Sequence, residues 1–183
     1  MTSIFDSMKE FIQMSLDGEP SNPLHVGEVM SCWMYMALMD EATIYIQMGL
    51  NSTFDDEVRS MLIKSLKQCE AQGQRFKEFM KQEGVHLPRT SEPRPDSDPN
   101  SVPLGVKMTD DEIMNGVSMK TVAAVMHCAA AASQSIRNDV SLLFTQCMLE
   151  KMKYGTELKG VMRNKGWIKV PPYYYPPGMP KER

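Results

Sequence analysis

The stretch VHLPRTSEPRPDSDPNSVPLGVKM, residues 85–108, divides the chain into two similar halves and decides how they are connected. Its five prolines exclude a continuous helix, because proline lacks the amide hydrogen and clashes with the preceding turn. An extended proline-rich segment covers about 3.1 Å per residue, so this one reaches roughly 70 Å. A helix of about 26 residues is only roughly 40 Å long. The segment can therefore run the whole length of a helical bundle.

On both sides of this segment the apolar residues recur at steps of three and four, which is the period of an amphipathic helix. Helix start and stop signals bound the stripes: Asn22 before Pro23, Thr53 before two aspartates, and a Thr109–Glu112 capping box. We predict four long helices and a short N-terminal one, at 23–49, 53–84, 109–134, 136–165 and 3–16.

The short turns near residues 51 and 135 and the long connection between them define the topology. This pattern predicts an all-α, ferritin-like antiparallel four-helix bundle with one long proline-rich crossover and a short N-terminal helix. We expect one domain over 1–183, made of a first hairpin (21–84), the crossover (85–108), a second hairpin (109–166) and an extended tail (167–183).

The two halves also match each other at one constant offset and without a gap. FMKQEGVHLP at 79–88 lies over VMRNKGWIKVP at 161–171, so the offset is the one that carries Gly84 onto Gly166. Apolar stripes align with one another easily, but a glycine and a nearby proline after each second helix are not stripe features. The offset predicts two equivalent hairpins.

Composition excludes several classes of function. The formal charge is −3 and no segment clusters Lys and Arg, so we expect no nucleic-acid partner. The longest apolar run, VMSCWMYMALM at 29–39, is too short to span a bilayer. The N-terminus lacks the features of a signal peptide, so we expect cytoplasmic synthesis. The 18 methionines predict a methionine-rich core, and the four cysteines have no CxxC spacing, so buried free thiols are expected. From their spacing about the first turn, Cys32 and Cys69 are predicted to face each other.

Three features of the second half recur in a known family: TDDEI at 109–113, Arg137 at the turn with an apolar stripe after it, and KGW at 165–167 followed by Pro171. With these features the second half resembles the coat F family of bacterial spore coat proteins. The whole chain, from about residue 21 to 175, is similar to a related ferritin-like family of spore-forming bacteria that is largely uncharacterised. The resemblance implies a structural or interaction role in the spore coat and supplies no catalytic residue. The partners it implies are a second copy or other coat proteins.

A ferritin-like bundle raises the hypothesis of a di-metal centre, which needs a Glu from two helices and Glu-x-x-His from the other two. Glu-x-x-His does not occur in this sequence. We therefore predict no metal, no cofactor and no catalytic residue.

Two polar pairs have both a functional and a structural interpretation. Glu41 interrupts an apolar helix near its inward stripe, where it is either a ligand or base, or a carboxylate neutralised by Lys151 across the core; we favour the second. His127 and Asp139 lie at similar height about the last turn and could form a hydrogen-bonded base, with Cys128 as nucleophile. A half-buried histidine with ordinary partners is the favoured interpretation.

The end of the chain carries Tyr173, Tyr174 and Tyr175 between prolines. Such a segment favours an extended conformation that presents its rings. The rings either pack over the bundle or dock on a partner. The leading interpretation is thus a non-enzymatic structural or interaction protein of the spore coat. The alternatives are a degenerate ferritin-like oxidoreductase that uses a metal or a thiol, and a bundle that binds a small apolar ligand.

Overall fold

The computed structural model describes residues 3–16 and 22–177, and over these residues the chain is helical without any strand. The helices are α1 (Ile4–Ser15), α2 (Val26–Leu50), α3 (Asp56–Gln82), α4 (Asp110–Gln134) and α5 (Asn138–Asn164), with a 3₁₀ turn, η1 (Pro99–Ser101), in the crossover. The predicted bounds agree with these within three residues.

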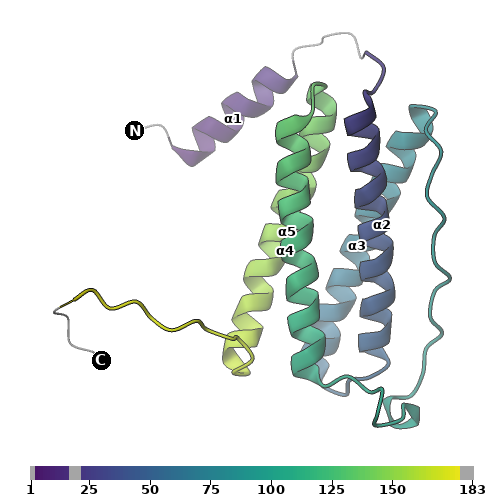
Figure 1. Ribbon diagram of the computed structural model, residues 1–183, viewed down its shortest axis with the longest axis vertical. Coiled ribbons are helices and arrows are strands. Elements are labelled where there is room, and N and C mark those ends of the chain that lie inside the picture. Colours follow the sequence, from purple (N-terminus) through teal and green to yellow (C-terminus); the bar gives the residue numbers. More distant parts are fainter. Residues whose placement is uncertain (1–2, 17–21, 178–183) are drawn as a thin grey trace.

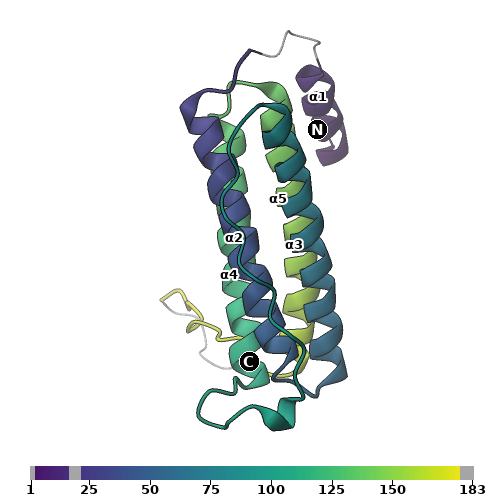
Figure 2. The same ribbon diagram turned by 90° about the vertical axis from the view of Figure 1, so that its right-hand side faces the viewer.

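The four long helices lie side by side in a four-helix-bundle-like arrangement (Figure 1). Helices α2 and α3 form one antiparallel hairpin, and α4 and α5 form the other. Helix α1 lies outside the bundle, near the end where α4 turns into α5 (Figures 1 and 2).

The crossover runs along the outside of α2 from one end of the bundle to the other (Figure 2). Polar side chains of α2 hold it there by accepting from its amides. Asp40 accepts from the Ser91 amide at 3.0 Å and from the Ser91 hydroxyl at 2.7 Å, and the Gln47 Oε1 accepts from the Arg94 amide at 2.8 Å. The predicted single long crossover is confirmed. Asp40, which directly follows the apolar run at 29–39, binds the crossover to α2.

The structure corrects two of the predicted helix N-caps. Helix α2 begins three residues later than expected, because the His25 Nδ1 caps it by accepting from the Gly27 amide at 3.0 Å. Helix α3 is capped by Asp55 rather than Thr53, whose hydroxyl accepts from the amide of Asp55 instead. The capping box of Thr109 at the start of α4 is confirmed.

The core lies between the four long helices, and six of its buried apolar residues are methionines. The largest fully buried side chains include Tyr35, Phe76, Phe144 and Tyr154. Burying a side chain of this size contributes roughly 2–3 kcal/mol relative to leaving it in water. Helix α2 is apolar on several sides: Met30 and Trp33 on its outer side are exposed, while Glu28 is buried.

The structure confirms the predicted offset for the second helix of each hairpin, whereas α2 (Val26–Leu50) and α4 (Asp110–Gln134) are displaced from it by two residues. Helices α3 and α5 are related by this offset at both ends. Both are followed by a glycine in the left-handed region, Gly84 with φ of 71° and Gly166 with φ of 74°. In both, the amide after the glycine donates to the carbonyl five residues earlier, at 2.9 Å and 2.8 Å.

Equivalent glycines face the neighbouring helix in each hairpin. A Cβ atom added to Gly73 would lie 3.9 Å from the Met39 Cβ, and one added to Gly155 would lie 3.4 Å from the Thr121 Cγ2. These two contacts are again related by the offset of the repeat. Gly73 and Met39 lie at the same height in the first hairpin. Counted from this pair at 1.5 Å per residue, Cys32 and Cys69 lie about 16 Å apart along the bundle axis. The predicted contact of the two cysteines is therefore wrong, because the hairpin is centred several positions later than assumed.

Candidate functional site

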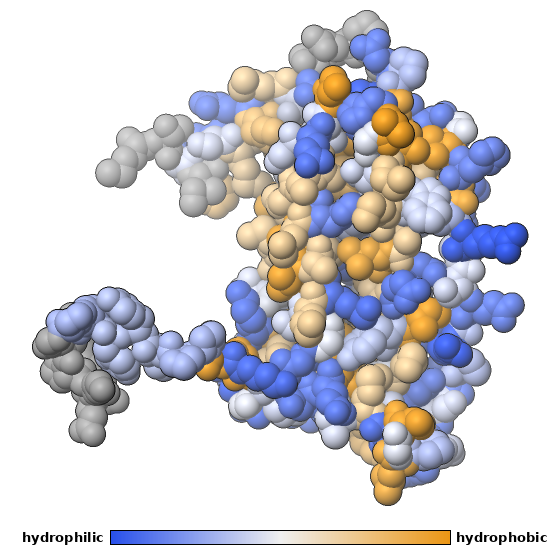
Figure 3. Space-filling model, in the orientation of Figure 1, coloured by the Kyte–Doolittle hydropathy of each residue, from blue (hydrophilic) through white to orange (hydrophobic). Residues whose placement is uncertain are grey.

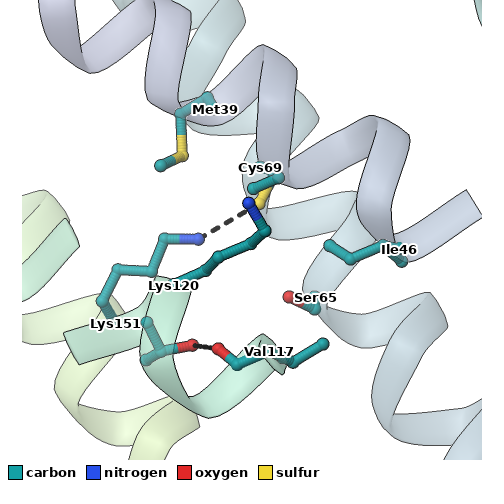
Figure 4. A pocket seen from close by; sticks show the side chains of 9 residues that line it. Met39, Ile46, Ser65, Cys69, Val117, Lys120 and Lys151 are labelled. Carbon is teal, nitrogen blue, oxygen red and sulfur yellow. Dashed lines mark hydrogen bonds between the residues drawn. The ribbon is translucent and has the colours of Figure 1, made fainter. Parts of the chain in front are cut away.

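A small cavity lies at the centre of the bundle and receives residues from all four long helices (Figure 4). It has room for about one water molecule. Its lining consists of Met39, Ala42 and Ile46 of α2, Ser65 and Cys69 of α3, Val117, Lys120 and Thr121 of α4, and Lys151 of α5. This is the position along the helices where a bundle core can hold a ligand.

Lys151 is the more deeply buried of the two lysines that line this cavity. It is only 3% exposed, and its Nζ lies 3.2 Å from the Cys69 Sγ. Cys69 and Lys151 are 82 residues apart, which is the offset of the repeat, so they occupy equivalent positions on α3 and α5. Among the described residues, Lys151 forms no ion pair with a carboxylate.

Glu41 does not reach Lys151, and the predicted buried pair of the two is wrong. Glu41 is exposed on α2, whose inward positions are occupied by Met39 and Ala42 at this height. The prediction failed because α2 is apolar almost all round, so the apolar stripe does not reveal which side faces the core. A small error of phase moves Glu41 from the surface to the core.

His127 is half-buried and has structural partners. Its Nε2 lies 2.9 Å from the Ser31 carbonyl oxygen, and because a carbonyl only accepts, this nitrogen carries the proton. Its ring stacks on Tyr35 at a centroid distance of 5.8 Å and meets the edge of Phe144. Asp139 is bound to Arg137 instead, with Oδ2 at 2.6 Å from a guanidinium nitrogen. The structure therefore does not bring His127 and Asp139 together as a base.

A ladder of polar groups, buried at Tyr35 and Gln72 and half-buried at Glu150 and Arg75, lies beside the aromatic cluster. The Tyr35 hydroxyl donates to the Gln72 Oε1 at 2.8 Å, and the Gln72 Nε2 donates to the Glu150 Oε2 at 2.7 Å. Arg75 completes the ladder with two bonds to the Glu150 Oε1, each of 3.2 Å. The ladder joins α2, α3 and α5, and each group in it has a partner.

Three thiols have raised pKa values, chiefly because burial disfavours the thiolate. The pKa is about 12 for Cys32 and for Cys128, and about 11 for Cys147. A thiol of this kind is protonated near neutral pH and is a poor nucleophile. Cys128, the candidate nucleophile beside His127, is thus placed as a core residue. Burial also raises the pKa of Tyr35 and of Tyr154.

Arg137 binds two carboxylates at the end of the bundle where α4 turns into α5. Its guanidinium binds both carboxylate oxygens of Glu83, at 2.7 and 2.8 Å, and both of Asp139, at 3.0 and 2.6 Å. It also donates to the Asn22 carbonyl oxygen at 3.0 Å and lies over the ring of Phe79. The carboxylates raise the pKa of Arg137, and Arg137 lowers the pKa of Asp139.

Glu28 adds a buried carboxylate to the same end. It is 2% exposed, and its Oε1 accepts from the amides of Ile136 and Arg137, both at 2.9 Å. Its Oε2 accepts from the His25 amide at 3.1 Å. Glu28 therefore caps α2 and fixes the α4–α5 turn at once. Sequence reasoning missed this role, because the partners are about 108 residues away.

The opposite end of the bundle has a related ion pair. The Lys165 Nζ lies 2.6 Å from the Asp55 Oδ2 and 3.5 Å from the Glu57 Oε2. Lys165 lowers the pKa of Asp55 by hydrogen bonding to it. Here the side chains are about 30% exposed for Lys165 and 26% for Asp55, against 8% for Arg137.

The tail tyrosines are exposed, and the segment after Ile168, which still packs against the core, leads away from the bundle (Figure 1). Separately, an apolar band follows the α4 face of the molecule (Figure 3). Within it a groove between α4 and α5 is lined by Val122, Val125, Met126, Met152 and Leu158, with Lys159 at its polar side. The tail and the groove both expose apolar or aromatic side chains that a partner could contact.

Within the described residues, no group of three or more His, Cys, Asp or Glu side chains is placed to hold a metal ion. No described helix is both long and apolar enough to cross a bilayer.

The fold and its interior define a class of protein: an all-helical bundle whose buried polar groups mainly bind one another. The chain belongs to the family described as "Protein of unknown function (DUF3231)", which matches residues 14–179. It is 30% identical over 160 residues to the uncharacterized protein YvdQ of Bacillus subtilis, an alignment that covers 87% of this chain and 94% of that protein.

Two solved structures are similar to this one. A crystal structure from Bacillus halodurans described as a "putative spore coat protein" matches with a TM-score of 0.82 and 28% identity, over 85% of this chain and 98% of that chain. A DUF305 fragment from Deinococcus radiodurans matches with a TM-score of 0.64 and 14% identity, over 78% of this chain and 99% of that chain. The second match concerns the fold alone.

Proposed function

We propose that this chain is a non-enzymatic structural or interaction protein of the bacterial spore coat, built on a ferritin-like bundle. The observation that carries the proposal is the likeness to the Bacillus halodurans protein, which extends over nearly the whole of that chain. The resemblance of the second half to the coat F family supports it independently of the fold. The protein would be made in the cytoplasm and deposited on the forming spore.

The interior supports a structural role on physical grounds. His127, the only histidine within a long helix of the described residues, donates to a backbone carbonyl. Glu28 accepts from backbone amides, and Glu150 is bound by Gln72 and Arg75. Acid–base catalysis needs a group that can exchange a proton with a substrate, usually in a cleft. In this bundle the titratable groups hold helices together.

The partners we propose are a second copy of the chain or other coat proteins. The α4–α5 groove and the tyrosines of the tail offer apolar and aromatic contacts, and aromatic residues are enriched at protein interfaces. Sedimentation velocity of the full chain and of a chain without residues 171–183 tests this. A smaller species after deletion supports docking through the tail, and an unchanged species points to the groove or to a different partner.

The direct test of the coat proposal is localisation. A fluorescent fusion of the full chain, expressed from a sporulation promoter in a Bacillus host, should form a ring around the forespore and stay with purified spores. Fluorescence that remains diffuse in the mother cell would contradict the proposal.

A second candidate is a degenerate ferritin-like oxidoreductase, and one contact favours it: the Lys151 Nζ at 3.2 Å from the Cys69 Sγ, next to a cavity. Metal analysis of the purified protein separates the two. Two equivalents of iron, manganese or zinc per chain would favour the oxidoreductase. We expect none, because a lysine ammonium at the centre of the bundle repels a cation.

A further inference from the structure

Cys69 and Lys151 bring two reactive side chains into contact in the interior of the bundle (Figure 4). The Lys151 Nζ lies 3.2 Å from the Cys69 Sγ, and the two residues are 3% and 2% exposed. Cys69 belongs to α3 and Lys151 to α5, so the contact joins the first hairpin to the second. A thiol and an amine this close need only one further atom to be joined covalently.

Hydrogen bonding does not account for the position of Lys151. A protonated lysine has three N–H donors, and among the described residues the acceptor found for its nitrogen is this sulfur, which is a weak acceptor. The neighbouring acid, Glu150, binds Gln72 and Arg75 instead. Burying an amine with so weak a partner costs stability. A buried polar group with this little compensation indicates a chemical role, of which redox chemistry is one.

Cys147 provides a comparison within the same core. Its Sγ lies 3.6 Å from a guanidinium nitrogen of Arg75. A guanidinium stays charged in proteins, whereas a lysine that releases its proton becomes a nucleophilic amine. Of these two thiols, Cys69 is therefore the one that lies beside a group able to form a bond with it.

We propose that Cys69 and Lys151 form an oxidative cross-linking site, in which one oxygen atom bridges the sulfur and the nitrogen as S–O–N. The oxidant is dioxygen, and the sulfur enters the first, reversible level of thiol oxidation. The S–H bond and one N–H bond of the neutral amine break, one S–O and one N–O bond form, and the O–O bond breaks. Sulfur and nitrogen each lose an electron pair, and these electrons reduce dioxygen to the bridging oxygen and one water molecule, which takes both protons. A lysine that starts as the ammonium releases its extra proton to solvent.

The oxidant has a route to the pair. Cys69 and Lys151 line the small central cavity, and Lys151 and Thr121 also line the groove between α4 and α5. Movement of the Lys151 and Thr121 side chains connects the cavity with this groove. Dioxygen, which is small and apolar, can then reach the sulfur from the surface.

The cross-link would tie α3 to α5 and close a loop of the chain between two residues 82 positions apart. A covalent link of this kind restricts the unfolded chain, as a disulfide does. The site would therefore make the bundle more stable once it is exposed to oxygen. This role does not rest on the coat proposal, because the link lies in the core and acts wherever the protein is placed.

Peptide mapping of the full-length wild type tests the cross-link directly. One sample is kept without oxygen in dithiothreitol, the other is incubated in oxygen-saturated buffer, and both are digested with trypsin. Trypsin cuts after lysine and arginine, so Cys69 lies on peptide 68–75, and a Lys151 blocked by the link lies on peptide 138–153. The oxygen sample should contain a species with the summed mass of these peptides plus one oxygen atom and minus two hydrogen atoms. Dithiothreitol should split it again.

Either of two results would overturn the proposal. If the two peptides stay separate in the oxygen sample, the contact is only a hydrogen bond. A linked species without the additional oxygen atom would be a direct S–N bond and would contradict the oxygen bridge.

Thermal unfolding measures the consequence for the fold. The Tm of the wild type after incubation with oxygen should exceed its Tm in dithiothreitol by roughly 5–10 °C, as for a disulfide-like link in a chain of this length. An equal Tm difference in Cys69→Ser would show that other groups cause it and would contradict the stabilising role of the link.

The variants separate the link from the charge and from thiol oxidation in general. Lys151→Arg keeps the positive charge and should remove both the linked species and the Tm difference. Cys69→Ser removes them from the other side of the contact, so the test stands even if Lys151→Arg does not fold. Cys147→Ala is the matched control, because it removes a buried thiol beside Arg75 and should leave the link and the Tm difference intact.

Discussion

The two ends of the bundle carry the same ion pair with its charges exchanged. The offset of the repeat carries Asp55 onto Arg137 and Glu83 onto Lys165, and Arg137 binds Glu83 while Lys165 binds Asp55. At one end of the bundle the cation is Arg137, which precedes α5. At the other end the cation is Lys165, which follows α5. The repeat therefore preserves the position of the contact, while the positive and negative charges of its two residues are exchanged.

The two ion pairs differ in their burial. Arg137 is 8% exposed, binds two carboxylates and a carbonyl, and lies beside the buried Glu28. Lys165 is 30% exposed and binds two acids at the surface. Exposed ion pairs contribute little to stability because water screens them, whereas breaking a buried pair leaves an uncompensated charge. The α4–α5 turn should therefore be the more tightly fixed end.

The largest effect is expected at Arg137. Arg137→Ala should lower the free energy of unfolding by about 3–5 kcal/mol, because Glu83 loses both of its hydrogen bonds and the Asn22 carbonyl loses its donor. The equivalent cation is the matched control: Lys165→Ala should cost clearly less. Urea unfolding followed by circular dichroism measures both, and equal losses would break the contrast between the two ends.

The next effect concerns the capping boxes of α2 and α4. Glu28→Ala removes the acceptor of three amides at the α2 start and the α4–α5 turn, and should cost about 2–4 kcal/mol. Glu112 occupies the same place in the capping box of α4 but is exposed, so Glu112→Ala should cost less. Chemical denaturation of the two variants side by side checks this, and a larger loss for Glu112→Ala would show that the buried turn is not what matters.

A smaller effect is expected from acid. Asp139 and Asp55 have pKa values below the ordinary 3.8, because Arg137 and Lys165 bind their charged forms. Their contribution to stability is therefore fully present above pH 3.8 and is lost as the pH falls through their lowered folded-state pKa values. Asp139→Asn should flatten the pH dependence of the unfolding free energy below pH 3.8. An unchanged slope in urea titrations at several pH values would mean that the Arg137–Asp139 bond is not formed in solution.

How far the sequence predicts these features depends on whether their cause is local. The helix bounds and the crossover follow from capping residues, glycines and prolines, which act within a few positions, and they were predicted closely. Glu41 was placed in the core wrongly, because α2 is apolar on several sides and its phase cannot be read. The partners of Glu28 and Arg137 were missed because they come from other helices. One signal in the sequence could have indicated the ion pairs. Two repeat-equivalent positions carry opposite charges in the two halves: Asp55 is equivalent to Arg137, and Glu83 is equivalent to Lys165.

The smallest effect on stability is expected from the tail. Deletion of residues 171–183 should leave helix content and the urea midpoint unchanged, because the tail tyrosines are exposed and the tail extends to the side of the bundle from the end of α5. Circular dichroism of the truncated chain checks this. A truncated chain that unfolds would mean that the tail belongs to the core.

In the proposed function the polar groups of the interior stabilise the fold, and the surface of the protein contacts its partners in the spore coat. The most direct measurement compares how much protein is retained in purified spores for three fluorescent fusions: the wild type, the double variant Cys69→Ala/His127→Gln, and the chain without residues 171–183. Circular dichroism first establishes that all three fold. The account predicts wild-type retention for the double variant and a marked loss for the truncated chain. A folded double variant that is lost from the coat, with the truncated chain retained, would contradict it.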